Sequence, residues 1–203
     1  MEPNHHPLPY FTHDNPYHDK LKSFDKFVLR DEEGESYKGQ WNDKAFKRKA
    51  PLILEIGSGY GHFMRDYCSK NPSVNFIGMD YKFKRSFNLA KKLNTLQKEN
   101  FFYLRANAAR VDCLFEESEI DKVLYFFPDP WPKNKHKKKR LFQEEFLKKV
   151  HHILKPNGKF FIKTDHNEYA EWMKSILLES RLFKIEMISF DIRKWSIRMP
   201  LFL

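Results

Sequence analysis

The sequence predicts an α/β fold in which a mostly parallel sheet has helices on both faces. Three observations support this prediction. From residue 51 onward, short apolar runs alternate with segments of helical periodicity. A glycine-rich turn directly follows the first apolar run. The chain has 203 residues, which is enough for one such domain with a sizeable core. We therefore expect a single domain over residues 23–203, preceded by a flexible N-terminal arm over residues 1–22.

The region before residue 51 has no clear periodicity. Residues 1–22 are rich in His, Pro, Tyr and Asn, a composition that favours a poorly ordered arm. Residues 23–50 are polar and of mixed charge, with scattered large apolar residues such as Trp41 and Phe46. We expect this second stretch to pack across the edge of the core.

The regular part of the chain predicts strands and helices in turn. Strands are expected where short, mostly apolar runs lie between turn residues, at 52–56, 75–80, 101–104, 123–127, 159–163 and about 183–190. Helices are expected where apolar residues recur every three or four positions, at 61–69, 83–96, 108–115, 141–154 and 167–179. Asn71-Pro72-Ser73 ends the first of these helices, and Lys155-Pro156-Asn157-Gly158 forms a stop and a turn.

Charge and cysteine content narrow the class of protein. The formal net charge is +10, which favours an anionic partner such as nucleic acid. Cys68 and Cys113 are far apart and in no Cys-x-x-Cys arrangement, so a reducing cytoplasm is expected. No apolar run approaches the roughly 20 residues that span a bilayer, so no membrane association is expected. The N-terminal histidines, including His5 and His6, have no carboxylate at ligand spacing, so no metal site is expected.

The glycine turn is the first candidate site. The stretch Glu55-Ile56-Gly57-Ser58-Gly59-Tyr60-Gly61 is followed by His62, which excludes both the phosphate loop and the Gly-x-Gly-x-x-Gly dinucleotide pattern. Asp80 ends the next strand, and its two oxygens can accept hydrogen bonds from both hydroxyls of a ribose. The turn and the acid should meet at the carboxyl edge of the sheet. This combination resembles the S-adenosylmethionine site of the Rossmann-like class I methyltransferases.

A proline-rich loop is the second candidate site. Three prolines in Pro128-Asp129-Pro130-Trp131-Pro132 stiffen the loop, which leaves the same sheet edge. Asp129 and Trp131 are therefore expected to face the cofactor. Six Lys or Arg follow among residues 133–140, which favours a strip that binds phosphates. For Trp131, two roles remain open: stacking on a nucleic-acid base and packing under the loop.

Together these segments resemble the bacterial tRNA (guanine-N7-)-methyltransferase family. The resemblance lies in residues 55–61, Gly78-Met79-Asp80, Phe127–Lys133 with His136 and Lys137 after it, and Lys163-Thr164-Asp165, and it covers roughly residues 40–190. It implies S-adenosylmethionine as cofactor and tRNA as partner. It further implies methylation of guanine N7 in the variable loop, at tRNA position 46, to give 7-methylguanosine.

The resemblance also implies roles for individual residues. The expected cofactor-binding residues are Glu55, Gly57, Gly59, Gly61, Asp80, Asn107, Ala108 and Asp129. The family usually has Glu where Asp80 stands, and an acid where Asn107 stands, so Asn107 brings no charge. Asp129 is the expected catalytic residue, beside both methyl donor and guanine. The expected substrate-binding residues are Lys133, Asp165 and Trp131.

One family feature is missing. The family carries a Thr-x-x-Glu motif between its last two strands, and the residues after Phe190 do not contain it. We therefore expect a shortened C-terminal hairpin. Two alternative functions remain: a methyltransferase acting on another nucleic acid or on protein, and a catalytically impaired RNA-binding homologue. The sequence does not decide between a monomer and a homodimer.

Overall fold

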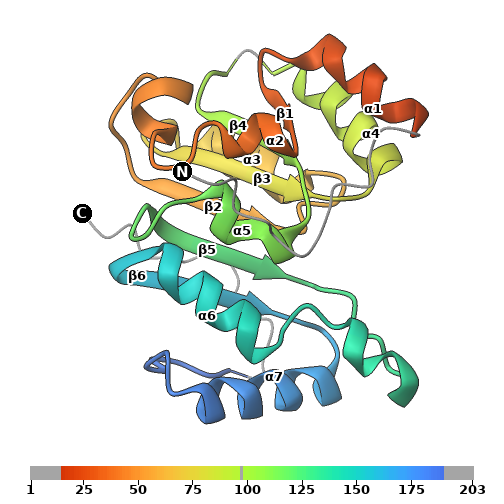
Figure 1. The fold of residues 1–203 in the computed structure, drawn as a ribbon, viewed down its shortest axis with the longest axis vertical. Helices are drawn as coiled ribbons and strands as arrows, with labels where there is room; N and C mark the ends of the chain where they lie inside the picture. The colour runs from red at the N-terminus through yellow and green to blue at the C-terminus, as the bar shows by residue number, and fades with distance from the viewer. Residues whose placement is uncertain (1–14, 97, 190–203) are drawn as a thin grey trace, which may run out of the picture.

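A computed structural model describes residues 15–96 and 98–189. Its sheet has the strand order β1-β4-β3-β2-β5-β6, and every pairing is parallel (Figure 1). The strands are β1 (Val28–Arg30), β2 (Leu52–Ile56), β3 (Asn75–Asp80), β4 (Phe101–Arg105), β5 (Ile120–Phe126) and β6 (Leu154–Lys163). The predicted parallel sheet is confirmed. The strand order reverses between β2 and β5, and ligands of open α/β sheets bind at such a point.

Helices cover both faces of the sheet, as predicted. The α-helices are α1 (Pro16–Leu21), α2 (Glu32–Glu35), α3 (His62–Lys70), α4 (Phe83–Leu93), α5 (Val111–Leu114), α6 (Glu144–Ile153) and α7 (Asn167–Ser180). Shorter helical turns are η1 (Lys22–Phe24), η2 (Trp41–Ala45), η3 (Ala108–Arg110) and η4 (Asn134–Lys139). The core forms two clusters, one on each face. Residues of α3 and α4 belong to one, and residues of α5, α6 and α7 to the other.

The central strand β2 shows why its sequence is apolar throughout. All five of its residues are buried. Leu52 and Leu54 belong to the cluster under α5 and α6, whereas Ile53 belongs to the cluster under α3 and α4. Successive side chains of a strand point to opposite faces, so a strand covered on both faces needs apolar residues at adjacent positions.

The N-terminal region differs from the prediction. Residues 16–21 form helix α1, whose N-terminus is capped by the Asn15 side chain, which accepts a hydrogen bond from the backbone N–H of Tyr17 at 3.0 Å. Leu21 is fully buried, and the Tyr17 ring lies 5.4 Å from that of Phe87 in α4. The expectation of a flexible arm is therefore wrong for residues 16–21. Residues 1–14, including His5 and His6, lie outside the described residues.

The short strand β1 was also not predicted. Its three residues pair with the end of β4 at one edge of the sheet, Val28 opposite Tyr103. Trp41, which was expected at the edge of the core, is fully buried, and its indole N–H donates to the carbonyl of Leu114 at 2.9 Å. The residues before 51 therefore extend the sheet as well as cover its edge.

The C-terminal part differs in two places. Residues 183–189 form no strand, so the predicted last strand is wrong over that stretch. Strand β6 begins at Leu154 because Leu154 pairs with Ile120 before the predicted turn. The register then moves to Lys122 opposite Lys159, so residues 155–158 form an irregularity within β6. The shortened hairpin and the missing motif fall on residues 190–203, which lie outside the described residues.

Three further properties concern the described part of the chain. No helix in it is both long and apolar enough to cross a membrane. Within residues 15–96 and 98–189, no three His, Cys, Asp or Glu side chains gather in a group that could hold a metal ion. Cys68 is buried, Cys113 is partly buried, and neither forms a disulfide bond.

Candidate methyl-transfer site

The glycine turn closes over the carboxyl end of β3. The backbone N–H groups of Gly57 and Ser58 donate to the carbonyl of Met79 at 2.8 and 2.9 Å. The N–H of Gly59 donates to the Asp80 carboxylate at 3.1 Å. The sequence therefore brings the turn and the acid together as predicted, although they lie about 20 positions apart in the chain.

Two glycines of this turn meet different surroundings. Gly57 has φ +84°, and a Cβ built on it would meet no atom within 4 Å. Gly61 has φ +67°, and its Cβ would lie 2.1 Å from Cδ1 of Leu89 in α4. Gly57 therefore leaves open space for a ligand to approach the backbone, whereas Gly61 allows α4 to pack closely against the turn.

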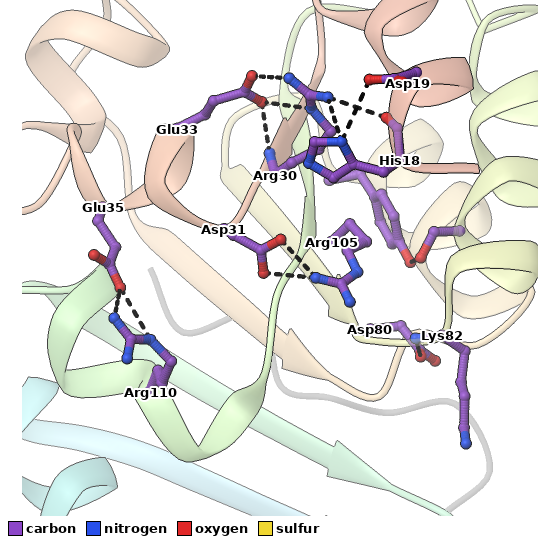
Figure 2. A network of polar contacts seen from close by, with 12 residues as sticks. His18, Asp19, Arg30, Asp31, Glu33, Glu35, Asp80, Lys82, Arg105 and Arg110 are labelled. Atoms are coloured by element: carbon purple, nitrogen blue, oxygen red, sulfur yellow. Dashed lines mark hydrogen bonds and ion pairs between the residues drawn. The ribbon is translucent and has the colours of Figure 1, made fainter. Parts of the chain in front are cut away.

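Asp80 is held in place by donors around it. Its Oδ1 accepts the backbone N–H of Lys82 at 2.9 Å (Figure 2). Its Oδ2 accepts the N–H of Gly59 and, at 3.2 Å, the guanidinium of the partly exposed Arg85. A carboxylate offers about four acceptor positions, so these three hydrogen bonds leave room for one more. Displacement of the Arg85 side chain would free a second.

Glu55 is a buried carboxylate without enough partners. Its side chain is 4% exposed, and its Oε2 has no hydrogen-bond partner. Burial raises the pKa of Glu55 to about 7; the nearby Ser58 hydroxyl lowers it in part, and the charge of Asp80 raises it further. An unpaired buried carboxylate oxygen is costly, and a cationic donor placed beside it would relieve that cost.

A groove of about 490 Å³ lies between the residues that follow β3 and β4 and the residues before and within α6. Tyr81, which follows Asp80, lines the groove together with Asn107 and Ala108, which follow β4. Residues 139–149 contribute the opposite wall, including Leu141 and Phe146. The Asn107 side chain accepts the N–H of Ala109 at 3.0 Å and so caps η3, which fixes it at the rim. The groove has a mixed apolar and polar lining suited to a planar base.

The proline-rich loop leaves β5 in a constrained conformation. Phe127 and Trp131 both have positive φ, 51° and 43°. The N–H of Phe127 donates to the carbonyl of Lys163 at 2.8 Å, which ties the loop to the end of β6. Asp129 is exposed between these two residues. Non-glycine residues with positive φ persist only where surrounding contacts hold them, and such strain often accompanies a functional site.

Arg140 supplies much of that support. Its side chain is only 2% exposed, and its Nε donates to the carbonyl of Pro130 at 2.8 Å. A second nitrogen, Nη2, lies 3.5 Å from the carbonyl of Trp131. The guanidinium lies over the rings of Tyr169 and Trp172 in α7, 4.7 and 4.8 Å from their centroids. The prediction that residue 140 belongs to an exposed phosphate-binding strip is therefore wrong for Arg140, which instead fastens the loop to α7.

Known proteins with similar sequences identify the family of this chain. A family model described as "Putative methyltransferase" matches residues 49–193, well over half of the chain. The tRNA (guanine-N(7)-)-methyltransferase of Clostridium tetani is 35% identical over 78% of this chain and 74% of its own length. The enzyme of the same name from Pediococcus pentosaceus is 39% identical over 70% of this chain and 66% of its own length. The chain belongs to the tRNA (guanine-N7-)-methyltransferase family.

Solved structures agree with the fold of this family. An antibiotic-related methyltransferase superposes with a TM-score of 0.50 and 18% identity, over 67% of this chain and 70% of its own. The predicted Rossmann-like class I methyltransferase fold is confirmed. The resemblance that the glycine turn and the proline-rich loop indicated is confirmed as well.

The residues predicted to bind the substrate lie at the same sheet edge. β5 and β6 are neighbours, with Phe126 opposite Lys163, so the loops that carry Asp129 and Asp165 leave side by side. Asp165 and Lys133 are both exposed. Trp131 is partly buried: its ring lies 5.6 Å from that of His136, and the ammonium of Lys139 lies 5.1 Å from its centroid. These contacts within the loop favour the packing role for Trp131.

A polar network that the sequence does not predict joins the N-terminal region to the end of β4, opposite Asp80. Asp31 forms a buried ion pair with Arg105 at 2.6 Å, as Figure 2 shows. Arg105 ends β4 directly opposite Asp80 of β3, and its guanidinium lies 3.6 Å from the ring centroid of Phe83. Burial raises the pKa of Asp31 to about 6, although Arg105 lowers it in part. The two partners lie 74 positions apart, and neither stands in a motif, so local sequence gave no indication of this contact.

Proposed function

We propose that this chain transfers a methyl group from S-adenosylmethionine to N7 of guanine in tRNA. The proposed product is 7-methylguanosine in the variable loop, at position 46, and the proposed compartment is the cytoplasm. The observation that supports this most directly is the unpaired, buried oxygen of Glu55 beside the open space over Gly57. Glu55 lies at the sheet edge from which the Asp129 loop also leaves. The chain belongs to the tRNA (guanine-N7-)-methyltransferase family.

The residues present fit the proposed cofactor. The Glu55 carboxylate would bind the ammonium group of the methionine part, which supplies the cation that its Oε2 lacks. Asp80 would accept the ribose hydroxyls, for which it has acceptor capacity left. The groove beside Tyr81, Asn107 and Ala108 would take the adenine. When bound, S-adenosylmethionine supplies an electrophilic methyl group on a positively charged sulfur.

The reaction requires little proton transfer by the protein. Guanine N7 has a free lone pair, which forms the new bond to the methyl carbon. The old carbon–sulfur bond breaks, its electron pair stays on sulfur, and the positive charge moves to the guanine. The chain's task is therefore alignment and electrostatic stabilisation. Asp129 or Asp165 would accept hydrogen bonds from N1–H and the exocyclic amine of guanine, which fixes the base and stabilises the cation as it forms.

The proposed partner is consistent with the surface next to the loop. Lys133, Lys135, Lys138 and Lys139 are exposed on and before η4. A cluster of exposed lysines beside the reacting base would bind backbone phosphates, whereas the acids at the sheet edge would select the base. We place the catalytic unit in a single domain over residues 23–203, against which helix α1 packs.

Transfer of labelled methyl to tRNA that lacks 7-methylguanosine tests the proposal, with nucleoside analysis of the product. The expected result is label in 7-methylguanosine. Label in another nucleoside would favour a different nucleic-acid methyltransferase, and no label with cofactor bound would favour an impaired RNA-binding homologue. D129N should lower turnover at least a hundredfold and leave the fold intact. D66N is the matched control, because Asp66 is an exposed acid on α3 that pairs with Lys70.

A further inference from the structure

Helix α4 carries positive charge only. Lys82 precedes it, and Lys84, Arg85, Lys91 and Lys92 lie within it, whereas no Asp or Glu occurs between residues 81 and 98. The other long helices mix both signs of charge: α3, α6 and α7 each contain acids as well as lysines or arginines. This difference is unexpected for a helix that merely faces solvent, because mixed charges are the usual composition of such a face.

The cations of α4 point away from the core. Ser86, Leu89, Ala90 and Leu93 form the buried face of the helix. Lys84 and Lys91 lie seven residues apart, on the same face by helical spacing, and both are exposed. Arg85 and Lys92 are also seven residues apart and lie beside Tyr60, 5.7 and 5.8 Å from its ring centroid.

In the described part of the chain, Lys82 and the lysines of α4 have no acidic partners. Among the described residues, no carboxylate forms an ion pair with Lys82, Lys84, Lys91 or Lys92. Lysines on other helices do have such partners, four or three residues away: Lys70 with Asp66 at 2.8 Å, Lys148 with Glu144 at 2.7 Å and Lys174 with Glu171 at 3.8 Å. Arg85 pairs with Asp80, but the charge of these four lysines is not balanced by a described carboxylate, which favours binding of an anionic partner there.

Exposed aromatic rings accompany this charge. Tyr60 and Tyr81 are 53% and 49% exposed. The ammonium of Lys82 lies 4.6 Å from the Tyr81 ring centroid, and that of Lys91 lies 4.9 Å from that of Phe87. Cations interleaved with exposed aromatic rings are typical of surfaces that bind a nucleic-acid backbone and stack on its bases.

The position of α4 relates this surface to the site. α4 starts three residues after Asp80, at the carboxyl edge of β3, and η4 follows the loop that leaves the carboxyl end of β5. Figure 1 shows both at the side of the sheet to which the strand arrows point. The site residues lie between them in the sheet, because the strand order places β2 between β3 and β5.

We propose that α4 is a second phosphate-binding surface for the tRNA, on the opposite side of the site from η4. This inference rests on the proposed function. A guanine buried in a folded RNA must be held while it is exposed from its stack, and two separate backbone contacts on either side of the base hold it better than one. The lysines at 84, 91 and 92 bind phosphates and carry no base specificity.

The triple variant K84A/K91A/K92A tests this surface, because alanine keeps the helix stable. Binding of unmodified tRNA is measured by filter retention over a series of salt concentrations. If each lysine contacts one phosphate, the slope of log K against log salt becomes shallower by about 0.9 per contact, or about 3 in all. At 0.1 M salt we expect tRNA affinity to fall at least tenfold, with cofactor affinity unchanged. The variant K84R/K91R/K92R should restore both slope and affinity.

The matched control is K70A/K148A/K174A. It removes the same charge, from +10 to +7, but from lysines that each pair with an acid of their own helix. We expect its slope to equal that of the wild type. If the wild type methylates tRNA but the two triple variants lose tRNA affinity equally, the role of α4 is overturned. The same holds if neither variant loses tRNA affinity. A wild-type protein that neither binds nor methylates tRNA would instead overturn the proposed function itself.

Discussion

Substitution of Gly57 by alanine separates ligand binding from folding. At φ +84° an alanine costs about 1–2 kcal/mol of unfolding free energy, because its Cβ approaches the following carbonyl oxygen. The new methyl group meets no atom within 4 Å, so no packing cost adds to this strain. For a chain of this size, each kcal/mol lowers Tm by about 2–4 °C, so we expect a fall of about 2–8 °C. The folded variant then places a methyl group in the space proposed for the cofactor.

Gly61→Ala is the matched comparison. It has the same strain at φ +67°, but its Cβ would lie 2.1 Å from a buried Leu89 methyl. Overpacking of this kind adds about 1–3 kcal/mol, for a total of roughly 2–5 kcal/mol. Gly61→Ala should therefore lower the Tm of the free protein more than Gly57→Ala does.

Thermal unfolding with and without S-adenosylhomocysteine distinguishes the two glycines. At a ligand concentration of 100 times Kd, the wild type should gain about 2.7 kcal/mol and a corresponding rise in Tm. Gly57→Ala should lose this rise, and Gly61→Ala should keep most of it. Full ligand-induced stabilisation of Gly57→Ala would refute the argument that the open space over Gly57 holds the cofactor.

Three further substitutions test other parts of the site. The pKa of Glu55 is raised from 4.5 to about 7, so its stabilising contribution is complete below pH 4.5 and is lost as the pH rises through 7. Glu55→Gln should therefore gain up to about 3 kcal/mol relative to the wild type between pH 5 and pH 8 in urea unfolding of the free protein; a pH-independent difference would contradict this. Arg140→Lys cannot donate to two carbonyls while it covers two rings, so kcat should fall at least tenfold; an unchanged kcat would contradict the role of Arg140 in holding the loop. Asp31→Ala leaves Arg105 buried without its ion-pair partner and should cost about 3–5 kcal/mol in denaturant unfolding, whereas D31A/R105M should recover part of it; a double variant as unstable as D31A would oppose the ion-pair account.

The arrangement of the glycine turn and Asp80 could be predicted because its geometry is local. The apolar run of β2, the glycines after it and the acid at the end of β3 are each set by short sequence patterns. Parallel strands then bring their carboxyl ends together, so Glu55, Gly57 and Asp80 meet without any further information. The C-terminal end of α4 and the N-terminal end of α6 each differ from the prediction by three residues, because periodicity alone defines helix ends weakly.

The parts that could not be predicted depend on distant partners. The three residues of β1 are too few to show a strand period, and pairing with Tyr103–Arg105 of β4 decides their conformation. Helix α1 has six residues, fewer than an isolated helix needs, and burial of Leu21 together with contact to α4 stabilises it. In both cases tertiary contact outweighs local propensity, and a single sequence does not show which segments will meet.

Arg140 differs from its neighbours in the basic run in residue type, and this difference indicates that it is buried. Residues 133–140 contain five lysines and one arginine, and the arginine is the buried one. A lysine ammonium is compact and strongly hydrated, so burial would cost it more than it costs the weakly hydrated guanidinium. The planar guanidinium can also cover Tyr169 and Trp172 while its edge donates to loop carbonyls, which an ammonium cannot do. The arginine at the end of this lysine run therefore acts as an inward anchor for the loop, whereas four of the five lysines before it are exposed.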